Sequence, residues 1–226
     1  MTYDKIINEN GKNQKLIGRY TFYEELFNGI THGIGALMSI VALIILVAFA
    51  GISGDIWRII SLSIYGFTLF FLYLSSTLYH CIFHEKSKQI LRIFDHVSIY
   101  LLIAGSYTPI TLIAMRGAWG WTIFSIIWVL AFVGILLKVI NLGKTKIIST
   151  VLYVIMGWLI IVAIKPMLQS LPTGLFSWLI AGGITYTLGL IFYLWKKLPY
   201  NHGIWHLFVL AGSIIHYLGF LFHLAI

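Results

Sequence analysis

Residues 29–50 read GITHGIGALMSIVALIILVAFA, a continuous apolar run without a charged side chain. An α-helix of roughly 20 such residues, rising about 1.5 Å per residue, crosses the hydrocarbon core of a bilayer. Comparable runs follow at residues 56–80, 90–115, 121–139, 147–168, 174–195 and 203–226. The pattern predicts an all-α membrane protein built as a bundle of seven transmembrane helices.

The composition supports the same class. Hydrophobic residues make up 60% of the chain and charged residues 10%, whereas a soluble domain carries roughly 25% charged residues. The formal net charge is +8, but the basic residues lie in short gaps between the apolar runs. We therefore expect membrane topology, and not a nucleic-acid partner, to explain the charge. The single cysteine, Cys81, excludes an internal disulfide and a cysteine-rich zinc site. We expect two parts, a polar and basic N-terminal segment at residues 1–20 and one seven-helix domain at residues 21–226.

Lys and Arg are distributed unevenly between the two ends of the predicted helices. Twelve of the 15 lie in the N-terminal segment or in the second, fourth and sixth gaps, whereas Arg58, Arg116 and Lys165 lie on the other side. Because basic residues favour the cytoplasm, the sequence predicts a cytoplasmic N-terminus and an external C-terminus. The chain is therefore expected to be a multi-pass protein of the plasma (inner) membrane.

With this orientation, six of the eight histidines and one aspartate fall at the cytoplasmic ends of the predicted helices. These residues are His32, His80, His84, Asp95, His96, His202 and His206. His202 and His206 are four residues apart, so a helix presents both on one face. The other two histidines, His216 and His223, lie roughly 15 Å and 25 Å further along the last helix from His206.

Ionisable side chains within membrane helices are costly and are candidate functional residues by default. Imidazoles with an oxygen ligand and no thiolate favour Zn²⁺, and three histidines with a nearby carboxylate are typical of an open, catalytic zinc site. Asp95 is then expected to orient or deprotonate a water molecule, and Ser76, one turn before His80, to hold a ligand or substrate oxygen. The residues alone leave a second interpretation open, in which interfacial histidines such as His84 and His96 are polar caps.

Three motifs resemble those of a known family. The stretch EELFNGITHGIG, with Glu24, Asn28 and His32, resembles its first motif. SSTLYH followed by FDH resembles its Ser-x3-His…Asp motif, and NHGIWH resembles its closing His-x3-His. Over nearly its whole length the chain is similar to the hemolysin III family, within the progestin and adipoQ receptor superfamily that includes the adiponectin receptors.

The resemblance implies a seven-helix fold with an internal N-terminus and a Zn²⁺ near the cytoplasmic face. It implies that His80, His202 and His206 bind the zinc and that Asp95 reaches it through water, which selects His80 over His84. For the first motif, two roles stay open: support of the zinc ligands, or packing.

The adiponectin receptors and the related alkaline ceramidases imply an amidase or esterase activity on lipids. Membrane lipids of the inner leaflet are therefore the candidate substrates. The stretch DHVSIYLLIAGSYTPITL is close to bacterial members and implies a bacterial source. The family's name implies cytolysis instead, so the alternative is a non-enzymatic membrane protein, a cytolysin or a sensor, with a structural zinc. Direct lysis fits the composition poorly, because a secreted pore-former is soluble before insertion.

Overall fold

The computed structural model describes residues 20–140 and 146–226, which contain seven segments long and apolar enough to cross a membrane. The predicted seven-helix bundle is confirmed for this part of the chain, whereas the orientation of its ends stays a prediction. The predicted N-terminal segment, apart from Tyr20, and the residues 141–145 of the fourth gap lie outside the described residues.

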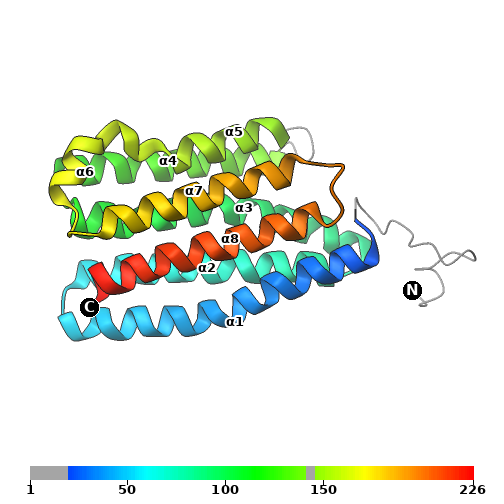
Figure 1. Cartoon of the computed structure of the whole chain (residues 1–226), viewed down its shortest axis with the longest axis horizontal. Coiled ribbons are helices and arrows are strands. Elements are labelled where there is room, and N and C mark those ends of the chain that lie inside the picture. Colours follow the sequence, from blue (N-terminus) through cyan, green and yellow to red (C-terminus); the bar gives the residue numbers. More distant parts are fainter. Residues whose placement is uncertain (1–19, 141–145) are drawn as a thin grey trace, which may run out of the picture.

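Four of the spans come first along the chain: α1 (Phe22–Ser53), α2 (Ile56–Cys81), α3 (Glu85–Pro109) with its π-helical extension η2 (Ile110–Ala114), and α4 (Ala118–Ile140). The fifth span combines α5 (Lys146–Gly157), the 3-10 helix η3 (Leu159–Ala163) and α6 (Ile164–Ser170). The last two are α7 (Leu175–Leu194) and α8 (Asn201–Phe220), which ends in the π-helix η4 (Leu221–Ala225). The helices run side by side along the long axis, and α1 begins at the end of the bundle opposite to that where α8 ends (Figure 1).

Two helices, α1 and α3, begin well before the apolar runs predicted, in polar first turns. The helix α1 begins at Phe22 because Thr21 and Glu24 form a capping box: the Glu24 N–H donates to Thr21 Oγ1 over 3.3 Å, and the Thr21 N–H donates to Glu24 Oε2 over 2.8 Å. The helix α3 begins at Glu85, with His84 as its N-cap residue. A search for apolar residues misses these polar first turns, which carry Glu25 and Lys88 into the bundle.

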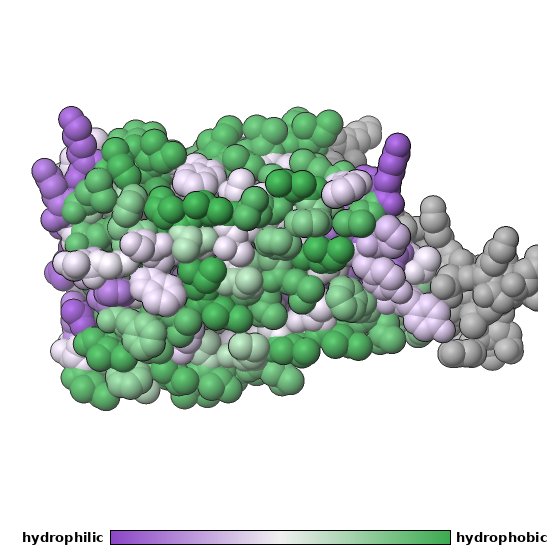
Figure 2. Space-filling view, in the orientation of Figure 1, coloured by the Kyte–Doolittle hydropathy of each residue, from purple (hydrophilic) through white to green (hydrophobic). Residues whose placement is uncertain are grey.

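The surface and the interior have the polarity expected of a protein in lipid. Figure 2 shows an apolar flank with hydrophilic residues at its two ends. Large apolar side chains point outward, among them Leu37 and Val162, which are 70% and 72% exposed. Several charged and polar side chains are buried instead. Because burial of an unpaired polar group is costly, these interior residues are where a function is expected.

Glycines allow α1 to approach two other helices closely at the end of the bundle where α1 begins. A Cβ added at Gly29 would lie 2.6 Å from Cys81 Sγ on α2, and one added at Gly203 on α8 would collide with the ring of Phe27. The first turns of α1 therefore lie against the end of α2 and the start of α8, and each of these helices carries histidines at that level.

Candidate metal centre

Three buried histidines from two helices converge where α1, α2 and α8 meet. His80 comes from the last turn of α2, and His202 and His206 come from the first turns of α8. Their side chains are 0%, 7% and 0% exposed, and one ring nitrogen from each lies within 4.8 Å of the others. The structure thus brings together the three residues predicted as metal ligands. His84 is not part of this cluster; it lies at the N-cap of α3 as a polar cap.

The ring nitrogens that face one another have no hydrogen-bond partner. This holds for Nε2 of His80, Nε2 of His206 and both nitrogens of His202. A buried polar atom left unpartnered costs about 1–3 kcal/mol. A cluster of unpartnered imidazole nitrogens at this spacing fits a bound cation, because each nitrogen with a free lone pair is a metal ligand.

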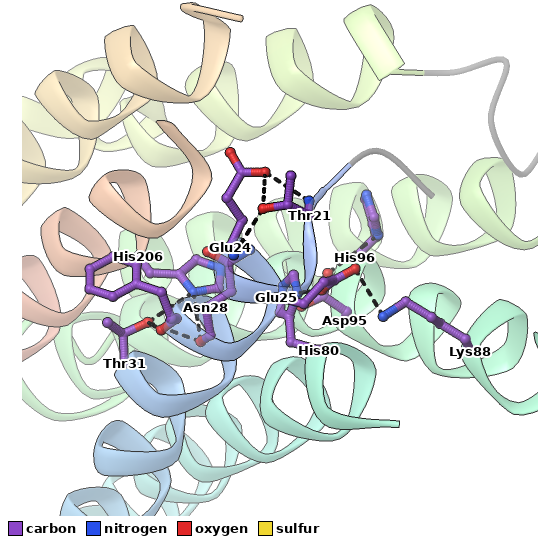
Figure 3. A network of polar contacts seen from close by, with 11 residues as sticks. Thr21, Glu24, Glu25, Asn28, Thr31, His80, Lys88, Asp95, His96 and His206 are labelled. Carbon is purple, nitrogen blue, oxygen red and sulfur yellow. Dashed lines mark hydrogen bonds and ion pairs between the residues drawn. The ribbon is translucent and has the colours of Figure 1, made fainter. Parts of the chain in front are cut away.

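The second nitrogen of His80 is held by a buried carboxylate. Its Nδ1–H donates to Glu25 Oε2 over 2.5 Å, and Glu25 Oε1 forms an ion pair with Lys88 Nζ at 2.9 Å. Figure 3 shows Glu25 between these two partners. Since Nδ1 carries the proton, the Nε2 lone pair is directed to the cluster. A carboxylate in this place also increases the basicity of a ligand imidazole.

The second nitrogen of His206 is held by α1. Its Nδ1 atom lies 3.3 Å from the backbone carbonyl oxygen of Asn28 and 3.3 Å from Thr31 Oγ1. Because a carbonyl can only accept, Nδ1 is the protonated nitrogen here as well, and Nε2 is left with its lone pair. Two of the three histidines therefore have the tautomer that metal binding requires fixed by their neighbours.

Two residues of the first motif, Asn28 and His32, contact His206, and the third, Glu24, contacts the segment before α8. Glu24 Oε1 accepts a hydrogen bond from the Tyr200 N–H over 3.2 Å, just before α8 begins. Asn28 supplies the carbonyl that holds His206. His32 is 2% exposed, and its ring stacks on that of His206 with a centroid distance of 3.5 Å and an interplanar angle of 9°. The structure therefore favours a supporting role for Asn28 and His32 over packing alone.

Asp95 and Ser76, the predicted catalytic residues, lie at the same end but outside the histidine cluster. Asp95 is 8% exposed, and one of its oxygens lies 3.6 Å from His96 Nδ1. Ser76 is 1% exposed. Its hydroxyl lies near the Asp95 carboxyl group, but no hydrogen bond of normal geometry joins the two side chains. The catalytic roles of both residues stay predictions.

A cavity of about 200 Å³ extends from this end into the bundle. Asp95 and His32 line it at the level of the histidine cluster, and most of its remaining lining is apolar or aromatic, with Ile103, Met167 and Leu179 as examples. His32 therefore contacts both the cavity and the ring of His206. A cavity of this kind is suited to an apolar chain whose polar end lies near the histidines.

Glu25 and Lys88 were missed by the sequence reasoning. Both lie in polar first turns that the apolar runs left out, and both are buried, at 1% and 3% exposure. Buried charges are normally paired. An acidic residue on one helix and a basic residue on another at the same predicted depth are therefore the signal by which the sequence could have indicated Glu25 and Lys88.

The sequence matches a family described as Haemolysin-III related over residues 20–217. It is 52% identical over 200 residues to Hemolysin-3 of Bacillus cereus, covering 88% of this chain and 91% of that protein. It is 49% identical over 204 residues to the Hemolysin-3 homolog of Bacillus subtilis (strain 168), covering 90% and 96%. A human protein, monocyte to macrophage differentiation factor, is 30% identical over 208 residues, covering 88% and 85%. The matched stretch contains every residue of the site described above.

Proposed function

The chain belongs to the haemolysin-III related family, and from its buried histidine cluster we propose that it is a zinc-dependent hydrolase of lipids, of the amidase or esterase type. The observation that carries the proposal is the cluster of unpartnered imidazole nitrogens at the end of the bundle where His32, stacked on His206, and the buried Asp95 line an apolar cavity. A ligand set and a proton acceptor then lie at one end of the bundle, from which a place for an acyl chain extends into it.

His80, His202 and His206 would hold the zinc ion. Neutral imidazoles suit Zn²⁺, and a set of three leaves a coordination position open, as catalytic sites require. When bound, the ion supplies Lewis acidity, which polarises a carbonyl group. Glu25 and the Asn28 carbonyl keep the protons of His80 and His206 on Nδ1, so that the Nε2 atoms stay available.

Asp95 and Ser76 supply the remaining chemistry. Asp95 accepts a proton from the water molecule whose oxygen attacks the lipid carbonyl, and the proton passes to the amine or alcohol when its bond to the carbonyl carbon breaks. The Ser76 hydroxyl, which is buried and has no hydrogen-bond partner of normal geometry, would hold an oxygen of the substrate. The largely apolar cavity that Asp95 lines would receive the acyl chain.

The substrate is proposed to come from the cytoplasmic leaflet of a bacterial plasma membrane. The basic residues near the site end of the described helices are Lys86, Lys88, Arg92, Lys138, Lys196 and Lys197. Those near the opposite end are Arg58, Arg116 and Lys165. This bias supports a cytoplasmic site, and membrane lipids are then its partners.

The test is a hydrolysis screen with the full-length protein in lipid nanodiscs. Wild-type protein is incubated with a panel of lipid amides and esters, before and after removal of zinc with a chelator and after zinc is added back. We expect hydrolysis that the chelator abolishes and zinc restores, and none from His206→Ala. Absence of zinc-dependent turnover across the panel would instead favour the alternative, a non-enzymatic membrane protein with a structural zinc. The relatives' name, Hemolysin-3, suggests a lytic role for such a protein.

A further inference from the structure

The three histidines of the metal centre are held in different ways. The rings of His80 and His206 are each fixed by a hydrogen bond at Nδ1, to Glu25 and to the Asn28 carbonyl oxygen. His202 lacks such a bond, since both of its ring nitrogens are buried without a partner. A ligand ring must be oriented as well as placed, because the lone pair of its nitrogen has to point at the ion. A contact other than a hydrogen bond must therefore orient His202.

The backbone at His202 is anchored, but this anchoring leaves the torsions of its side chain unset. The adjacent Asn201 donates from Nδ2 to the carbonyl oxygens of Phe192 and Tyr193 over 3.0 Å and 3.3 Å. These bonds tie the start of α8 to the end of α7 and so fix the Cα position of His202. The direction of the imidazole still depends on what lies against its ring.

The ring that lies flat against His202 is that of Tyr20, the residue just before the capping box of α1. The two rings are stacked, with a centroid distance of 4.9 Å and an interplanar angle of 27°. The rings of Tyr193 and Trp205 also contact His202, but they are more tilted, at 47° and 40°. Stacking of this kind is favourable for aromatic pairs. It also restricts the imidazole, which cannot turn far out of its plane without meeting the tyrosine ring.

We propose that Tyr20 is a positioning residue of the metal centre, whose ring holds His202 in the orientation that zinc binding requires. This rests on the proposed function, in which His202 is a zinc ligand. Tyr20 acts through His202, because its ring is further from that of His80, at 6.2 Å, and tilted to it by 57°. Residues 20–32 then support every ligand of the site, with hydrogen bonds to His80 and His206 and a stacked ring on His202.

The test is zinc binding by the full-length protein in nanodiscs, measured by competition with a chelator. Tyr20→Leu keeps an apolar side chain but has no flat ring, whereas Tyr20→Phe keeps the ring. We expect Tyr20→Leu to lower zinc affinity about two- to tenfold, the cost of immobilising one side chain when the ion binds, and Tyr20→Phe to keep the wild-type value. Tyr23→Leu is the matched control, because Tyr23 is 47% exposed and its ring contacts Phe22. It should also keep the wild-type value.

The rates of zinc exchange separate orientation of His202 from simple cover of the site. Loss of a cover would speed uptake and release of zinc by the same factor and leave the affinity unchanged. Loss of positioning lowers the fraction of molecules that are ready to bind. In Tyr20→Leu, zinc uptake should therefore be no faster than in the wild type, while the affinity falls. Faster uptake with unchanged affinity would contradict the proposal.

Other results would also overturn the inference. Wild-type affinity in Tyr20→Leu would show that the ring is not needed, and an equal loss in Tyr20→Phe would assign the effect to the hydroxyl group. An equal loss in Tyr23→Leu would make the effect general to the start of α1. If Tyr20→Leu fails to fold, Tyr20→Met takes its place with the same expected result. Zinc binding with the expected order of affinities but no hydrolysis would reject the proposed hydrolase alone, and hydrolysis with equal affinities would reject this inference alone.

Discussion

Replacing Glu25 with Gln separates the two tasks that the structure gives this carboxylate. One oxygen accepts a hydrogen bond from His80 Nδ1–H at 2.5 Å, and the other pairs with Lys88 Nζ at 2.9 Å. Glutamine keeps the size of the side chain and one acceptor oxygen but loses the negative charge. We expect zinc affinity to fall about 10- to 100-fold, the usual loss when a carboxylate behind a ligand histidine is removed.

The same substitution should destabilise the fold, because it leaves the ammonium group of Lys88 buried without a counter-ion. Glu25 and Lys88 are 1% and 3% exposed, so the cost for a buried pair applies, about 3–5 kcal/mol, and not the smaller one of an exposed pair. The double variant Glu25→Gln/Lys88→Met removes both charges. It should recover most of the stability while zinc affinity stays low.

The assay is a zinc titration against a competing chelator, with thermal unfolding of the same preparations. Glu24→Gln is the matched control, because Glu24 is the adjacent residue but bonds to Thr21 and to the Tyr200 N–H, and it should keep wild-type zinc affinity. Wild-type affinity in Glu25→Gln would refute the reasoning. So would a double variant that recovers zinc affinity together with stability, since Glu25 would then act through folding alone.

Three further outcomes are expected. Asp95→Asn should keep the fold and most of the zinc and lower lipid hydrolysis about 10²- to 10⁴-fold, the cost of a missing general base; unchanged turnover would remove Asp95 from the chemistry. Ser76→Ala should lower kcat/KM about 10²-fold with zinc retained. Ser75→Ala is the control and should match wild type, because the Ser75 hydroxyl is bonded to the Phe71 carbonyl at 2.6 Å. Equal effects of the two substitutions would argue against a specific role of Ser76. A topology reporter fused after Ile226 should be active only outside the cytoplasm, and one inserted between Lys144 and Lys146 only inside it; the reverse pattern would move the site to the external leaflet.

The sequence predicted the fold class well, because apolar runs long enough to cross a bilayer have few alternative structures. It predicted the grouping of His80, His202 and His206 for a related reason. The alternation of helix direction fixes which ends meet, and the spacing of four residues fixes which face His202 and His206 share. The resemblance to a family was needed to choose His80 over His84, since both lie at the same end of one run. The structure makes the difference visible: α2 ends at Cys81, and His84 caps the next helix.

The supporting contacts could not be predicted in the same way. Glu25 and His80 are 55 positions apart in the chain, and their contact depends on the rotation of α1 about its axis, which a helical period leaves free in a lipid-facing helix. The first motif suggested Glu24 because of its spacing from Asn28 and His32. The helix places the neighbouring Glu25 against His80 instead and directs Glu24 to α8. The cavity was not predicted either, because its lining comes from several helices far apart in sequence.

The zinc content of purified protein tests the central claim most directly, because the site and the chemistry both depend on it. Elemental analysis of the wild-type protein should give about one zinc ion per chain. His80→Ala and His206→Ala should lose the ion, because two remaining protein ligands hold it too weakly against water. His216→Ala and His223→Ala should keep it. Full zinc occupancy in both His80→Ala and His206→Ala, or wild-type protein purified under zinc-replete conditions without the metal, would contradict the account.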